Sequence, residues 1–212
     1  MAICERLSLG PIGTNCYFVR ADEDATDTVV VDPSGLADEL LPALERRGLR
    51  CSAILVTHGH FDHILGVADL AEASGADVTM PEGERVLLER PEAFTPPGII
   101  VRPWSPEVGV SGGETLERCG LTFEVLSVPG HSPAHVAYVV DGELLSGDVL
   151  FRGSVGRTDL PGGDWPTLLA SIAELYDRLP PETHVLPGHG EPTTLAAERA
   201  TNPFLGPLRE HG

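Results

Sequence analysis

Three histidines and one aspartate lie within six residues of one another, in the segment His58-Gly59-His60-Phe61-Asp62-His63. An apolar run ending at Thr57 precedes it. Because side chains two apart on extended backbone point the same way, His58 and His60 can reach one metal ion together, and Asp62 and His63 can reach a second ion beside it. Imidazole and carboxylate groups suit a borderline metal such as zinc better than calcium or magnesium. The segment therefore predicts a metal site.

Three further segments share a pattern in which an apolar run ends at a candidate ligand in a glycine-rich turn. They are Val128-Pro129-Gly130-His131, Leu145-Ser146-Gly147-Asp148 and Leu186-Pro187-Gly188-His189. Each is weak evidence alone, because a histidine after Pro-Gly is as often an ordinary loop residue as a ligand. Loops at strand ends commonly perform chemistry in sheet proteins. Together with the first segment they supply enough donor groups for two metal ions.

Short apolar runs rich in Val and Ile predict the strands that would position these groups. The predicted strands are 17–19, 29–32, 53–57, 121–128, 136–140 and 143–145. Leucines at helical spacing predict a helix from Leu36 to Gly48, a second helix follows His63 and stops at Gly75, and Asp164 caps a third. Residues 91–113 are rich in Pro and Gly and predict mainly loop or cover. These mixed elements, with no linker between them, predict one α/β domain over residues 1–212.

The composition indicates a soluble folded protein with an acidic surface. Acidic residues number 32 against 14 basic ones, for a net charge of −18, and every basic residue is Arg because the chain has no Lys. Codon bias and adaptation to high salt are both open as reasons for the missing Lys. An acidic surface repels polyanions, so we expect neither nucleic acid nor anionic membranes as partners. Without Lys, no Schiff-base or general-base lysine can operate.

The cysteines and the N-terminus indicate a cellular compartment. Cys4, Cys16, Cys51 and Cys119 are widely spaced with no C-x-x-C pair, which favours reduced cysteines over disulfides or a thiolate metal site. No signal-peptide pattern is visible, and no apolar run approaches the roughly 18 residues that a membrane span needs. We therefore expect a cytoplasmic protein, and the sequence favours no particular oligomeric state.

The order His-x-His-x-Asp-His, Pro-Gly-His, Gly-Asp and Pro-Gly-His resembles the metallo-β-lactamase fold superfamily over nearly the whole chain. The resemblance implies a four-layer αββα sandwich with the metal site at one edge of its two sheets. It also implies two divalent metal ions, with zinc favoured and iron or manganese as alternatives. The resemblance implies that the first ion is bound by His58, His60 and His131. The second ion would be bound by Asp62, His63 and His189, and Asp148 would bridge the two ions.

Longer segments narrow the resemblance. Residues 147–164, 187–194 and 198–204 are similar to the short, single-domain bacterial glyoxalase II-like hydrolases. That similarity implies hydrolysis of a small-molecule thioester of the S-lactoylglutathione class. In this reaction Asp62 and Asp148 would orient the attacking hydroxide, and Asp62 would accept its proton. Asp148 disfavours antibiotic hydrolysis, because antibiotic-hydrolysing relatives commonly replace the bridging Asp with Cys or omit it.

Two departures from that pattern concern glutathione. Only 23 residues follow His189, so we expect no helical C-terminal domain of the kind that helps long glyoxalase II enzymes hold glutathione. Those enzymes also use lysines near the thiol, and this chain has none. Arg157 is the one candidate substrate contact. An ion pair with Asp159 that shapes the loop is the alternative role, and it is the favoured one.

Other functions remain open. The Gly-Arg-Thr-Asp element at 156–159 is shared with persulfide dioxygenases, which use one iron and would here employ His58, His131 and Asp148. Lactonases acting on acyl-homoserine lactones retain the same seven ligands, and a nonenzymatic binding or scaffold role is the remaining alternative.

Three residues outside the ligand set carry weaker expectations. Asp32 either holds a ligand loop by hydrogen bonds or forms an ordinary turn. His135 is expected to be a hydrogen-bonded or core histidine and not a ligand. No role is assigned to His184 or His211.

Overall fold

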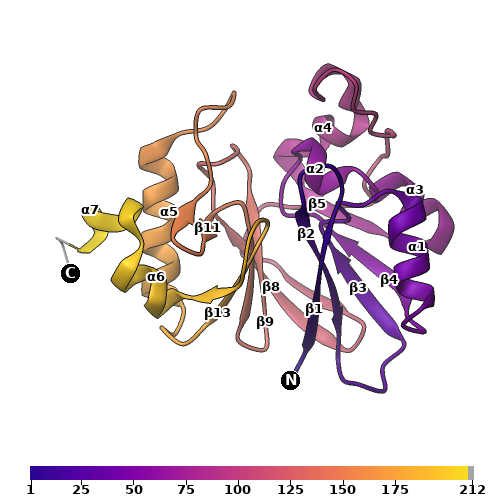
Figure 1. Ribbon diagram of the computed structural model, residues 1–212, viewed down its shortest axis with the longest axis horizontal. Coiled ribbons are helices and arrows are strands. Elements are labelled where there is room, and N and C mark those ends of the chain that lie inside the picture. The colour runs from indigo at the N-terminus through magenta and orange to yellow at the C-terminus, as the bar shows by residue number, and fades with distance from the viewer. Residues whose placement is uncertain (210–212) are drawn as a thin grey trace.

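Two six-stranded sheets stack face to face between two layers of helices in the computed structural model, which describes residues 1–209 (Figure 1). The first sheet has the order β1-β2-β3-β4-β5-β6 and the second β14-β13-β10-β9-β8-β7. The strands of the first are β1 Ile3–Leu9, β2 Thr14–Arg20, β3 Asp27–Val31, β4 Arg50–Leu55, β5 Val78–Pro81 and β6 Val108–Val110. Those of the second are β7 Thr115–Arg118, β8 Leu121–Ser127, β9 Val136–Val140, β10 Glu143–Gly147, β13 His184–Pro187 and β14 Thr193–Thr194. A small ribbon pairs β11 Leu150–Phe151 with β12 Ser154–Val155.

Helices cover the outer face of each sheet, as Figure 1 shows. On the first sheet they are α1 Ala37–Glu45 and α3 Val67–Ser74, and on the second α5 Trp165–Arg178 and α6 Leu195–Thr201. Shorter turns are α2 Phe61–Ile64, η1 Glu82–Glu84, α4 Arg85–Glu89, η2 Pro91–Ala93, η3 Pro203–Leu205 and α7 Gly206–Arg209. The predicted αββα sandwich is therefore confirmed. No helix within residues 1–209 combines the length and apolar character needed to cross a membrane.

Side-chain alternation along the buried strands explains the four layers. In β3, Val30 packs into the cluster shared with α1 and α3, whereas Val29 and Val31 join the cluster between the two sheets. Successive strand residues point to opposite faces, so a strand buried on both sides is apolar throughout. A third cluster joins the second sheet to α5 through residues such as Leu168 and Ile172. The apolar pattern of the chain thus fills three interfaces between four layers.

The predicted helices form, with one interruption. Asp164 caps α5 by accepting a hydrogen bond from the Thr167 N–H at 2.9 Å, as expected. The helix expected after His63 is broken into α2 and α3 at Gly66, where an added Cβ would stand 2.1 Å from the Gly35 carbonyl oxygen. The loop expected over 91–113 is mostly irregular, but β6 pairs with β5 in parallel within it. The four cysteines are free thiols, and Cys16 and Cys51 are buried.

Strand direction places the ends of β4, β8, β10 and β13 at one edge of the sandwich. In the second sheet β10 runs parallel to β13 and antiparallel to β9, which in turn is antiparallel to β8. Two backbone hydrogen bonds join the sheets at this edge, from Val136 N–H to the Thr57 carbonyl at 3.0 Å and from Asn15 N–H to the Gly188 carbonyl at 2.7 Å. The four segments that carry candidate ligands leave the sheets here, as expected for ligands at strand ends.

Candidate metal centre

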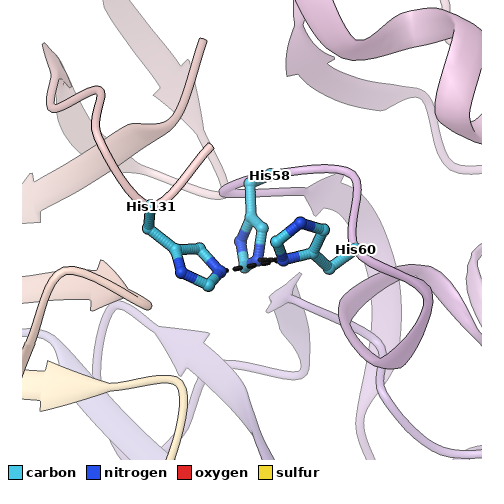
Figure 2. Close-up of side chains that lie close together, drawn as sticks. All are labelled: His58, His60 and His131. Atoms are coloured by element: carbon cyan, nitrogen blue, oxygen red, sulfur yellow. Dashed lines mark hydrogen bonds between the residues drawn. The ribbon is translucent and has the colours of Figure 1, made fainter. Parts of the chain in front are cut away.

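Three histidine rings converge between the loop after β4 and the loop after β8 (Figure 2). The Nε2 atom of His58 lies 3.1 Å from Nδ1 of His60, and Nε2 of His131 lies 2.8 Å from the same Nδ1. His58 and His131 are fully buried and His60 is half-buried. The three nitrogens predicted to bind the first ion therefore face one point.

The groups behind these rings fix which nitrogens carry lone pairs. The Thr57 hydroxyl donates to Asp32 at 2.8 Å, so it accepts from Nδ1–H of His58 at 3.1 Å. Nδ1–H of His131 donates to the Arg157 carbonyl at 2.7 Å. Both Nε2 atoms then present lone pairs to His60, whose single N–H can satisfy only one of them. A cation between the three nitrogens fits this arrangement, because it accepts every lone pair at once.

A second group of donors lies beside the first. Nε2 of His63 is 3.4 Å from Oδ2 of Asp62 and 3.3 Å from Oδ1 of Asp148. Nε2 of His189 is 3.3 Å from Oδ2 of Asp62. Within residues 1–209, the buried Nε2 of His63 and Oδ1 of Asp148 have no hydrogen-bond partner. Unpartnered buried donors and acceptors of this kind are rare unless an ion or water completes them.

Asp148 lies between the two groups. Its Oδ1 faces His63 at 3.3 Å, and its Oδ2 lies 3.5 Å from Nε2 of both His131 and His189. The donor atoms form three overlapping sets, each within 4.8 Å, namely His58–His60–His131, His58–His63–Asp148 and Asp62–His63–His189. The structure thus brings together all seven residues that the resemblance implied as ligands, with Asp148 between the two groups.

Electrostatics keep His58 and His60 neutral and the carboxylates ionised. Burial lowers the pKa of His60 to about 4 and that of His58 well below its usual value, and the neighbouring imidazoles add to both shifts. Burial opposes ionisation of Asp62, but His63 and the hydrogen bond with His189 outweigh it and hold the pKa at about 2. The pKa of Asp148 is lowered for the same reasons. Neutral imidazoles and ionised carboxylates are the donor forms that a metal ion requires.

The carboxylates also act on the histidines of the second group. Burial opposes protonation of His189, yet hydrogen bonds with Asp148 and Asp62 raise its pKa to about 9. The pKa of His63 is raised despite complete burial, because Asp62, Asp148 and Asp32 all face it. The negative potential that raises these pKa values is the same potential that would attract a metal cation.

Asp32 and His135 support the ligands from behind. Asp32 accepts hydrogen bonds from Thr57 N–H at 2.7 Å and from Nδ1–H of His63 at 2.9 Å. The interpretation that Asp32 holds the ligand loop is therefore confirmed. His135 is fully buried, stacks on the His58 ring, and its Nε2 accepts from the backbone N–H of Asp148 at 3.1 Å. It supports two ligands, in agreement with its expected role.

Glu84 was missed by the sequence analysis. Its carboxylate is 2% exposed and accepts from Gly59 N–H at 2.6 Å, from the Ser132 hydroxyl at 2.5 Å and from Ala134 N–H at 3.0 Å. It therefore ties the loop of His58 and His60 to the loop of His131. A single glutamate in a short polar turn carries no sequence signal for this role.

The remaining residues of interest lie near the centre, away from it, or outside the described residues. Thr14, also missed, donates to Oδ2 of Asp62 at 2.7 Å. Arg157 makes two hydrogen bonds of 2.7 Å to the Asp159 carboxylate, so the ion pair that was its favoured role is confirmed. His184 pairs with Glu143 at 3.0 Å, away from the centre, and His211 lies outside the described residues.

A cavity of about 530 Å³ opens over the donor atoms. His60, Asp62, His131, Asp148 and His189 reach it from one side. A cavity of this size is large enough for a small molecule, and the donor groups form part of its lining.

Known proteins resemble this chain over most of its length. A family model described as "Metallo-beta-lactamase superfamily" matches residues 9–189. The probable metallo-hydrolase YqgX of Bacillus subtilis (strain 168) is 38% identical over 205 residues, which are 94% of this chain and 96% of the relative. The hydroxyacylglutathione hydrolase GloC of Haemophilus influenzae is 34% identical over 206 residues, 90% of this chain and 92% of the relative.

Solved structures share the fold. The BLEG-1 B3 metallo-beta-lactamase superposes with a TM-score of 0.90 at 38% identity, covering 96% of this chain and all of that one. TTHA1623 in a di-iron-bound form gives a TM-score of 0.82 at 42% identity, covering 95% of this chain and all of that one. ETHE1 from Myxococcus xanthus gives 0.77 at 25% identity, covering 99% and 90%. The family match, these relatives and the four-layer fold show that the chain belongs to the metallo-beta-lactamase superfamily.

Proposed function

We propose that this chain is a hydrolase that uses two divalent metal ions to cleave thioesters of the S-lactoylglutathione class. The observation that supports it most strongly is the meeting of seven nitrogen and oxygen donors at one edge, with Asp148 between the two groups. The relative named hydroxyacylglutathione hydrolase supports the substrate class. Superfamily members are generally metal-dependent hydrolases, and a second relative is named as a metallo-hydrolase.

The chain's own residues have defined tasks in this reaction. Metal ions bound here would lower the pKa of a water molecule and polarise the thioester carbonyl. Asp62 and Asp148 reach the cavity as ionised carboxylates, so either can accept a hydrogen bond from the attacking water and orient it. Asp62 would take up the proton, and Thr14 holds one of its oxygens in place. The departing thiolate is a good leaving group, so no strong general acid is needed.

Zinc is the metal we propose first, because imidazole and carboxylate donors suit it. Iron is the principal alternative, since a 42% identical relative is described in a di-iron-bound form. The same donors also accept manganese.

Two other reactions have specific support. A relative at 38% identity is described as a B3 metallo-beta-lactamase, which favours lactam hydrolysis as a second candidate despite the presence of Asp148. Persulfide dioxygenation is favoured by the Gly-Arg-Thr-Asp element at 156–159 and would use one iron held by His58, His131 and Asp148.

Metal content and three assays on one purified sample test the proposal. We expect about two metal ions per chain, thiol release from S-lactoylglutathione, little lactam cleavage and no oxygen uptake on persulfide. Asp148→Asn should bind metal poorly and lose nearly all activity, whereas His184→Ala, an exposed histidine outside the centre, should behave as the parent. One metal in the fully loaded protein, with Asp62, His63 and His189 dispensable, would refute the binuclear hydrolase.

A further inference from the structure

Large apolar side chains make up part of the cavity lining besides the donor residues. They include Ile12 from the β1–β2 turn, Leu87 from α4, Phe94 after η2 and Leu160. Ile12 is 57% exposed and Phe94 is 54% exposed, although both are large apolar side chains. Apolar groups left in water beside a cavity gain by covering a ligand, because burying them is favourable. These side chains therefore match an apolar part of a substrate.

The same cavity offers little to an anion. Among the described residues that line it, Arg157 is the one basic side chain apart from the histidines, and Asp159 already engages it through two hydrogen bonds. The Ser132 hydroxyl is occupied by Glu84. The thiol half of a glutathione thioester carries two carboxylates, and the whole chain carries a net charge of −18. Those carboxylates would lose water without gaining a free cation.

We propose that this cavity selects thioesters whose thiol half is uncharged and apolar, in preference to thioesters of glutathione. The proposal rests on the proposed thioester hydrolysis and names its substrate more narrowly. The apolar thiol half lies against Ile12, Phe94 and Leu160, while the acyl carbonyl reaches the donor atoms. Asp159 takes two of the N–H donors of Arg157 and balances its charge, which weakens the attraction of Arg157 for substrate carboxylates.

Lactoyl thioesters of three thiols test the selection with the reacting carbonyl kept constant. We expect kcat/KM to be at least about tenfold higher for the thioester of benzyl mercaptan than for that of glutathione, a ratio that one pocket contact can supply. The thioester of N-acetylcysteamine should fall between them. The difference should lie in KM, because remote contacts of this kind bind ground state and transition state equally. Equal rates, or a preference for glutathione, would overturn the selection while leaving thioester hydrolysis intact. Cleavage of none of the three would overturn the proposed function itself.

Two variants test the apolar lining and the cation separately. Phe94→Ser should raise KM roughly tenfold for the benzyl thioester alone, and Ile100→Ser, another exposed apolar residue but outside the cavity, should change nothing. Asp159→Asn should release Arg157 and lower KM for the glutathione thioester alone. An unchanged benzyl KM in Phe94→Ser, or an unchanged glutathione KM in Asp159→Asn, contradicts the corresponding half of the proposal.

Binding without turnover gives an independent measurement. Thioethers cannot be hydrolysed, so calorimetry with benzyl methyl sulfide and with S-methylglutathione, which differ only in the thiol half, measures affinity directly. We expect the neutral, apolar thioether to bind more tightly, and raised salt to tighten only the glutathione compound by screening the acidic surface. Tighter binding of S-methylglutathione at low salt would overturn the proposal.

Discussion

Three histidines of the candidate centre are oriented by a hydrogen bond on the side of the ring that faces away from it. Thr57 holds His58, Asp32 holds His63, and the Arg157 carbonyl holds His131. In His58 and His131 this bond takes up one ring N–H and leaves the other nitrogen as a lone pair directed at the centre, and in His63 it fixes Nδ1 so that Nε2 faces the centre. Such outer partners set ligand orientation and basicity, so the centre extends beyond its seven donors.

The second donor group gives the first prediction. His63→Ala and His189→Ala should each lower kcat/KM for thioester hydrolysis by at least about a hundredfold. Losing a residue that only hydrogen-bonds to a ligand typically costs about 10- to 100-fold, and losing a ligand should cost at least as much. A dioxygenase with one iron on His58, His131 and Asp148 has no use for either histidine as a ligand. Kinetics on both variants, with circular dichroism to show that they fold, make the measurement. Folded variants with full activity would refute the hydrolase, and oxygen uptake on persulfide would then favour the dioxygenase.

Glu84 gives a second prediction, because it joins the two loops that carry the first group. In Glu84→Gln the amide keeps one acceptor oxygen, so either Gly59 or the Ser132–Ala134 side loses its hydrogen bonds. We expect metal affinity at the first group to fall about 10- to 100-fold, as for other outer partners. Competition with a chelator measures this without reference to activity.

Glu82→Gln is the matched control for that experiment. Glu82 begins the same η1 turn, but its side chain is 60% exposed and pairs only with Arg85 among the described contacts. It should leave metal affinity unchanged. Equal affinity in both variants would show that Glu84 contributes nothing to the centre.

The donors themselves were predictable from the sequence, whereas their supporting residues were not. Histidine and aspartate at strand ends have few structural explanations, and their order matched a known pattern. Glu84 and Thr14 act through contacts with residues 25 to 50 positions away. No local pattern encodes such contacts, because they depend on how the two sheets meet.

At the scale of elements, the turn that presents His189 needs glycine because two other ligands crowd it. A Cβ at Gly188 would stand 2.2 Å from Oδ1 of Asp148 and 2.7 Å from Cε1 of His63. We predict that Gly188→Ala displaces Asp148, loses metal and abolishes most activity although every ligand residue is kept. Metal analysis and activity, measured on protein shown to be folded, check this.

Gly142→Ala is the control for that variant. Gly142 has a φ of +85° in the β9–β10 turn, and an added Cβ there meets nothing within 4 Å. It should be destabilising by about 1–2 kcal/mol through backbone strain and should retain its metal. Metal loss of equal size in both variants would show that stability, and not crowding at Asp148, controls metal binding.

The strands and helices that were predicted are those with strong apolar patterns. Strands β3 and β4 are buried on both faces, and helix α5 has an N-cap residue, so the local sequence is enough to predict these three elements. Strand β6 is a short edge strand of Val-Gly-Val, and its position depends on pairing with β5. The break at Gly66 also depends on tertiary contact, since the Gly35 carbonyl and Leu40 occupy the space of a side chain. Both features follow from packing and have no local signal.

At the scale of the whole molecule, the centre joins the two sheets. His58, His60, Asp62 and His63 follow β4 of the first sheet, whereas His131, Asp148 and His189 follow β8, β10 and β13 of the second. Carboxylates and lone pairs from both halves therefore face one another across this edge. Cations bound by donors from both sheets would link the two halves.

The last prediction is that removing metal lowers thermal stability. Ligands that bind only the folded state at about 100 times their Kd stabilise it by about 2.7 kcal/mol. For a chain of this length that corresponds to a Tm shift of about 5–10 °C. Calorimetry before and after chelation, with metal loss verified, should show this fall, and added zinc should reverse it. Asp148→Asn, which we expect to bind metal poorly, should show a smaller shift. A Tm that does not change when the metal is gone would mean that the ions do not link the two halves of the fold.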